Sequence, residues 1–153
     1  MRDGPALLCY DGSEPSRRAI EAAGELLKGG PALVLTVWEP YRPSLLSPVS
    51  STIGVASGIA KEFDEVSVDI ATKTAEEGAG IASAAGFEDV KPLIVHGKPR
   101  DAIVEAAEEH NARIVVMGNR GQGGAESVLY GSVSTAVLHR APVPVLVVRG
   151  PEV

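Results

Sequence analysis

The chain has 153 residues, of which 44% are hydrophobic, with a mean hydropathy of +0.11 and a formal net charge of −6. This length and composition predict one domain over residues 1–153, and the acidic balance argues against a broad nucleic-acid or anionic-membrane surface. No long apolar run and no signal-peptide layout occur, so a cytoplasmic protein is expected. Cys9 is the only cysteine, which excludes an internal disulfide and favours a buried, unreactive side chain.

The first part of the chain alternates between short apolar runs and one helical segment. Ala6–Tyr10 and Ala32–Val37 are typical of buried strands. Between them lies a helical pattern with Ser13 as its expected N-cap and Gly29-Gly30-Pro31 as its end. Residues 39–58 are rich in proline and serine and have no clear period. We therefore expect a long irregular segment there, either a functional flap or a poorly ordered connection.

The middle of the chain continues with a helix, a strand and a helix. The first helix is expected at about Ala60–Ala85, before Gly86, with one face turned toward the core: Phe63, Val66, Ile70, Ile81 and Ala85. A short strand follows at Leu93–Val95. The next helix is expected at about Pro99–His110, because proline suits a first helical turn.

The last third repeats the alternation. A strand is expected at Arg113–Met117, a helix after Ser132 that ends before Pro142, and a final strand at Val143–Val148. Parallel strands need crossover connections, and right-handed crossovers place helices on both faces of the sheet. The sequence therefore predicts an α/β fold with a single open five-stranded parallel sheet.

Two loops at predicted strand ends are candidates for ligand binding, because ligands of open α/β sheets bind there. Asp11 lies at the end of the first strand, where its carboxylate can meet ribose hydroxyls or a metal, or serve only in a turn or helix cap. After the fourth strand, Gly118-Asn119-Arg120-Gly121, nine residues and Gly131-Ser132 follow the pattern G-x2-G-x9-G-S.

The glycine-rich pattern is suited to a phosphate-binding loop. Gly118 and Gly121 would let the backbone approach a ligand, and Gly131 and Ser132 would offer donors at the positive end of a helix. Arg120 can reach a phosphate or be a plain exposed loop residue. A merely flexible loop is the alternative, although it leaves the return of Gly-Ser at the helix start unexplained.

Together, these loops, the alternation and the closing residues 142–148 resemble the universal stress protein family over nearly the whole chain, and the glycine pattern resembles its ATP-binding subgroup. The resemblance implies an adenine nucleotide alpha hydrolase-like sheet in the order 3-2-1-4-5. It also implies ATP, with Mg or Mn, at the ends of strands 1 and 4. The residues that would hold it are Asp11, Val37, Met117, Gly118, Arg120, Gly121, Gly131, Ser132 and Val133.

The expected function is an ATP-binding regulatory module of the stress response that works with an unknown protein partner. No catalytic residue and no metal ligand set is assigned, since no Walker, Rossmann, paired-histidine or nucleophile-elbow motif occurs. A slow ATP hydrolase or phosphoryl-transfer enzyme and a nucleotide-free dimeric scaffold remain the alternatives. A homodimer through the apolar final strand is also expected, because the family's strand order puts that strand at an edge.

Overall fold

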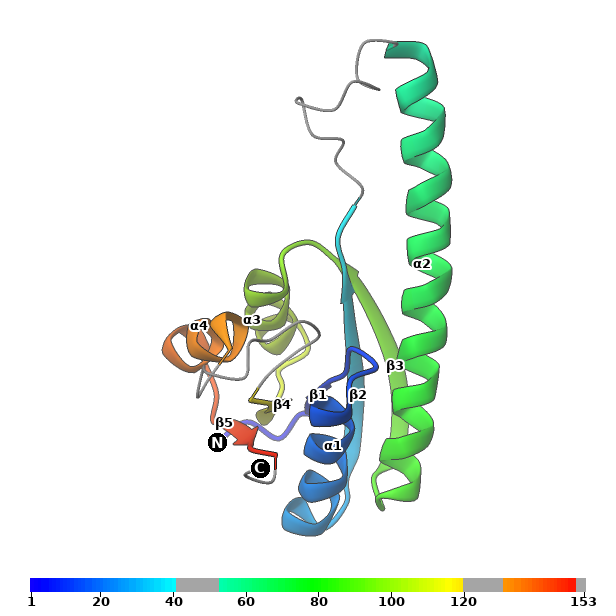
Figure 1. The fold of residues 1–153 in the computed structure, drawn as a ribbon. Helices are drawn as coiled ribbons and strands as arrows, with labels where there is room; N and C mark the ends of the chain where they lie inside the picture. Colours follow the sequence, from blue (N-terminus) through cyan, green and yellow to red (C-terminus); the bar gives the residue numbers. More distant parts are fainter. Residues whose placement is uncertain (41–52, 120–130, 151–153) are drawn as a thin grey trace.

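The computed structural model describes residues 1–40, 53–119 and 131–150. Within these ranges, five parallel strands form one sheet in the order β3-β2-β1-β4-β5, which confirms the predicted order (Figure 1). The strands are β1 (Ala6–Cys9), β2 (Pro31–Trp38), β3 (Glu88–His96), β4 (Ile114–Gly118) and β5 (Val145–Val148). The helices are α1 (Glu14–Leu27), α2 (Ile53–Ala84), α3 (Pro99–Glu109) and α4 (Ser132–Arg140).

Helices cover both faces of the sheet, because its central strands are apolar on both sides. Leu8 and Val116 face one layer, where they pack with side chains of α1 and α2. Leu7 and Val115, their neighbours along the strands, face the opposite layer with α3 and α4. Successive side chains of a strand point to opposite faces, so a continuous apolar run is what a doubly covered sheet requires.

The chain order reverses between β1 and β4, which pair side by side in the middle of the sheet. In the register, Leu8 lies between Val34 of β2 and Val116 of β4. The carboxyl ends of β1 and β4 therefore lie together, and the loops that follow them diverge to opposite faces. Such a divergence leaves a crevice above the strand ends.

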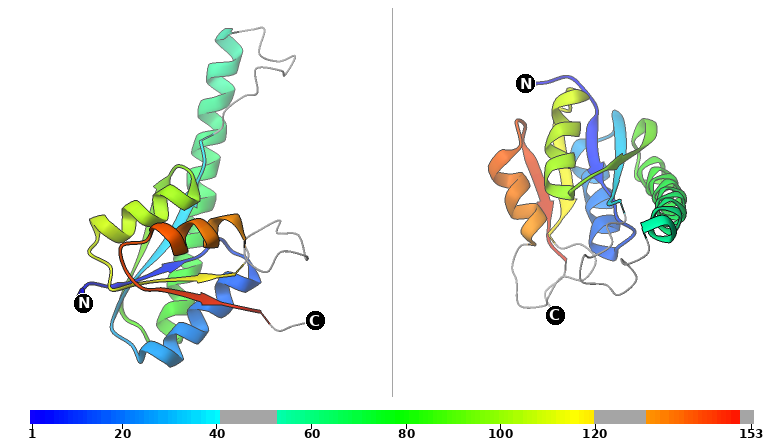
Figure 2. Two further views of the ribbon diagram at one scale, coloured as in Figure 1. Left: turned by 90° about the vertical axis from the view of Figure 1, so that its left-hand side faces the viewer. Right: turned by 90° about the horizontal axis from the view of Figure 1, so that it is seen from above.

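Helix α2 differs from the prediction in its start and in its inward face. It begins at Ile53, so the last part of the segment expected to be irregular is helical, while residues 41–52 lie outside the described ranges. Small residues face the sheet: Ala71, Ala75, Gly78 and Ala82. Phe63, Val66 and Ile70 are instead 50%, 54% and 60% exposed, because this part of α2 extends beyond the sheet (Figures 1 and 2).

The outer strands also depart from their predicted bounds. β3 begins at Glu88 rather than Leu93 and includes Pro92, which an edge strand tolerates because proline lacks an N–H to donate. Much of β3 is polar, so its apolar pattern marked only the end of the strand. β5 begins at Val145 rather than Val143 and forms the other edge.

Candidate functional site

A cavity of about 620 Å³ opens at the carboxyl ends of β1, β2 and β4. The starts of α3 and α4 complete its wall. Its lining residues are Cys9, Tyr10, Asp11, Ser16, Leu35, Val37, Glu39, Pro99, Ile103, Met117, Gly118, Asn119, Gly131, Ser132, Val133 and Ser134. Its position is the crevice where the strand order reverses, and its volume lies in the range of small-molecule sites.

One side of the cavity is apolar and formed by strand residues together with α3. Leu35, Ile103 and Met117 are buried and belong to the same core cluster as the partly buried Val37. Cys9 also lies in this wall, where burial and the nearby Asp11 raise the pKa of its thiol to about 12. The thiol therefore stays protonated at neutral pH and is a packing group rather than a nucleophile.

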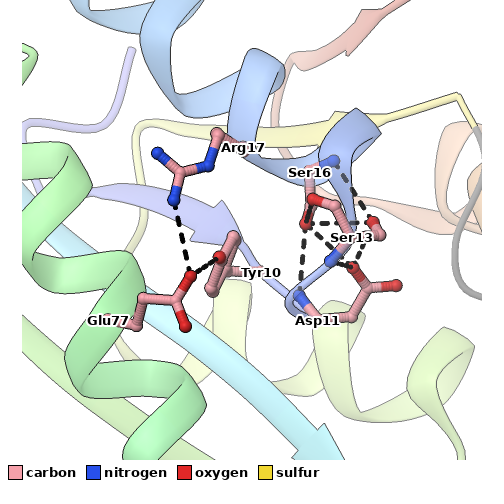
Figure 3. A network of polar contacts seen from close by, with 6 residues as sticks. All are labelled: Tyr10, Asp11, Ser13, Ser16, Arg17 and Glu77. Atoms are coloured by element: carbon pink, nitrogen blue, oxygen red, sulfur yellow. Dashed lines mark hydrogen bonds and ion pairs between the residues drawn. The ribbon is translucent and has the colours of Figure 1, made fainter.

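The other side of the cavity carries Asp11, whose carboxylate is held by the turn into α1 (Figure 3). Its Oδ1 accepts hydrogen bonds from the Ser13 backbone N–H at 3.0 Å, from the Ser13 hydroxyl and from the Ser16 hydroxyl at 2.8 Å. Ser13 is the N-cap of α1, as predicted. Asp11 thus serves in the turn, one of the two roles considered for it, and lies in the cavity wall as well.

Tyr10 faces away from Asp11 and connects β1 to two helices (Figure 3). Its hydroxyl donates to Glu77 Oε1 of α2 at 2.5 Å, and the same oxygen lies 3.5 Å from the Arg17 guanidinium of α1. Burial, followed by the bond to Glu77, raises the pKa of Tyr10 to about 12. On the β2 side, the buried Thr36 hydroxyl donates to the Tyr10 carbonyl at 2.9 Å. These contacts fix the strand end that presents Asp11.

The two ends of the glycine-rich segment meet beside the cavity. The Gly131 N–H donates to the Asn119 carbonyl at 2.8 Å, and the Ser134 hydroxyl donates to the Gly131 carbonyl at 2.9 Å. Gly131 is the N-cap of α4, and no side chain of the described residues caps its first turn. The positive end of α4 therefore faces the cavity through Ser132 and Val133, where backbone N–H groups favour an anion.

Two glycines of the motif have other reasons for being glycine than those predicted. A Cβ on Gly118 would lie 2.8 Å from the Pro15 carbonyl carbon, so the end of β4 needs glycine to pass α1 closely. Gly131 has φ −67°, which any residue can adopt, and its N–H is already bonded to Asn119. Phosphate donors at this end would have to come from the residues after Gly131.

The structure brings together most of the residues predicted for the site. Those that line the cavity are Asp11, Val37, Met117, Gly118, Gly131, Ser132 and Val133. Arg120 and Gly121 lie outside the described residues. Sequence reasoning missed Ser16, Glu39 and Ile103, although the helix starting at Pro99 could have suggested Ile103. No cluster of three or more His, Cys, Asp or Glu side chains that could hold a metal occurs in the described ranges.

Comparison with known proteins gives consistent matches over almost the whole length. The model of the universal stress protein family matches residues 4–149. A universal stress protein of Thermus aquaticus is 34% identical over 146 residues, which cover 94% of this chain and 96% of that protein. The solved structure of MJ0577 has a TM-score of 0.80 and 25% identity over 100% of both chains. A universal stress protein in complex with cAMP has a TM-score of 0.65 and 28% identity, covering 97% and 98% of the two chains.

No helix in the described part of the chain combines the length and the apolar character needed to cross a membrane.

Proposed function

The chain belongs to the universal stress protein family, and we propose that it binds an adenine nucleotide in the cavity at the ends of β1 and β4. One observation carries the proposal. A single cavity joins an apolar wall, a carboxylate held by two serines and the N-terminal end of a helix. These three features suit a base, a ribose and a phosphate respectively.

In this proposal the base lies against Leu35, Ile103 and Met117, and the backbone at Val37 meets its polar edge. The ribose hydroxyls donate to Asp11, whose carboxylate is fixed in place by Ser13 and Ser16. The phosphates lie at the start of α4, near Ser132 and Val133. The related structure solved with cAMP supports an adenine nucleotide as the ligand class.

The number of phosphates depends on charge. The described cavity wall carries two carboxylates, Asp11 and Glu39, and no Lys or Arg side chain. A triphosphate would therefore need a counter-charge besides the helix end, which Mg or Mn can supply when held by phosphate oxygens and Asp11. We expect ATP to bind tightly only with a divalent cation and AMP to bind with or without one.

Isothermal calorimetry of Gly131→Val tests the proposal. The φ of Gly131 suits valine, so the fold should survive while the branched side chain obstructs the start of α4. We expect at least about tenfold weaker binding of AMP and of ATP with Mg²⁺. Thr135→Val, on α4 but outside the cavity lining, is the control. Equal nucleotide affinity of Gly131→Val and the parent would refute this placement of the phosphates.

Glu39 is a second carboxylate in the cavity wall and favours a test of the hydrolase alternative. A carboxylate can orient an attacking water, but transition-state charge would also need stabilising groups. We expect a regulatory binding module with little or no turnover. A phosphate-release assay with ATP decides the matter, because turnover near about 10 per second would be that of an ordinary enzyme. In that case Glu39→Gln should abolish the release.

A further inference from the structure

The part of α2 that extends beyond the sheet carries an exposed apolar stripe. Phe63, Val66 and Ile70 are each half exposed or more. Their spacing of three and four residues puts them on one face of the helix, as in a helix that packs against another helix. This face lies roughly a third of a turn from Ala71 and Ala75, which pack on the sheet side. The stripe is thus separate from the surface that attaches α2 to the body.

The attached part of α2 is held firmly, so the stripe is presented by a fixed support. A Cβ on Gly78 would lie 2.6 Å from Tyr10 Cδ1 and 2.7 Å from Val34 Cγ1, which shows how closely the helix approaches β1 and β2. Glu77, the preceding residue, accepts the hydrogen bond from Tyr10 and lies beside Arg17 (Figure 3). A helix that is fixed at one end presents its projecting face at little entropic cost on binding.

The border of the stripe is acidic. Residues 60–77 contain six carboxylates and two lysines. Glu62 and Asp69 are exposed and lie about a quarter of a turn from the stripe, with Lys73 further along the same border. An apolar stripe beside carboxylates complements a helix that has apolar residues on one face and Lys or Arg next to them.

The same charges argue against two other occupants. In an antiparallel pair with a second copy, Glu62 and Asp69 would face their own equivalents, and like charges at such positions are unfavourable. An anionic lipid surface would be repelled by the same row and by the net charge of −6. A basic partner helix is the occupant that both the apolar and the charged residues favour.

We propose that the Phe63–Val66–Ile70 stripe with its acidic border is a docking surface for a basic amphipathic helix of another protein. The contact area is small, so the complex should be weak and readily reversed. The surface lies on α2, outside the cavity lining, and the proposal does not depend on nucleotide binding.

Two labelled peptides of about 20 residues test the proposal by fluorescence anisotropy, both with leucine at heptad a and d positions. One has lysine at the flanking positions and the other has glutamate. We expect the lysine peptide to bind the parent protein, and Val66→Ser with Ile70→Ser to weaken it at least about tenfold. Leu26→Ser, at a leucine that is 64% exposed on α1, is the matched control and should bind like the parent. Circular dichroism shows that each variant is folded.

The charge argument has its own pair of variants. Glu62→Lys with Asp69→Lys should shift the preference to the glutamate peptide. Glu105→Lys with Glu109→Lys makes the same change of net charge on α3 and should leave the preference for the lysine peptide in place. The proposal is overturned if both peptides bind the parent equally, if the serine variant binds like the parent, or if both charge pairs act alike. Sedimentation of a parent dimer that the serine variant dissociates would assign the stripe to a second copy instead.

Discussion

Replacing Gly118 with alanine tests why the site motif contains this glycine. The new Cβ would lie 2.8 Å from the Pro15 carbonyl carbon and 2.9 Å from its oxygen. Both are backbone atoms in the first turn of α1, whose start is fixed by Ser13 and Asp11. Neither can move without disturbing that turn. Overpacking of this kind lowers the free energy of unfolding by about 1–3 kcal/mol. In a chain of this size the melting temperature should fall by about 2–4 °C per kcal/mol.

Urea unfolding followed by circular dichroism measures the change, with Gly80→Ala as the opposite case. A Cβ on Gly80 meets no atom within 4 Å, and the residue is exposed in α2. There alanine should raise the free energy of unfolding by about 0.5–1 kcal/mol, because it loses less backbone entropy in a helix. If Gly118→Ala were as stable as the parent, the contact with Pro15 would not be the constraint. The ligand-approach explanation for this glycine would then stand again.

Three further predictions concern the carboxylate, the phenol and the sheet edge. Ser16→Ala removes a donor to Asp11 and should weaken AMP binding in calorimetry about tenfold, while equal affinity would show that the bond does not orient the carboxylate. The free energy of unfolding should fall between about pH 10 and 12, since the unfolded chain releases the Tyr10 proton before the folded one does. Urea titrations of Tyr10→Phe should show a shallower fall, and an unchanged slope would assign it to other groups. Val147→Lys should give monomers in sedimentation from a parent that dimerises through β5, and a parent already monomeric at micromolar concentration would contradict the dimer.

The sequence by itself determined the order of the elements and the class of the fold. The strands are continuous apolar runs because both faces of this sheet are covered, and such runs stand out from the spacing of α1 and α3. Local signals were equally clear at helix starts, as at Ser13 and Ser132. The position of Asp11 and Gly131 at the edge of one cavity followed from the same rule, since strand ends of a parallel sheet share an edge.

Only the tertiary structure decided which apolar residues of α2 are buried. Phe63, Val66 and Ile70 have the spacing of a core face, but the sheet ends before it reaches them, and the length of a sheet is not encoded in the helix that crosses it. The structure also assigned Gly118 to close packing with Pro15, because a glycine in a sequence does not reveal its spatial neighbours. Ser16 and Glu39 entered the site for the same reason: contacts between distant segments arise from the packing of elements, not from their local pattern.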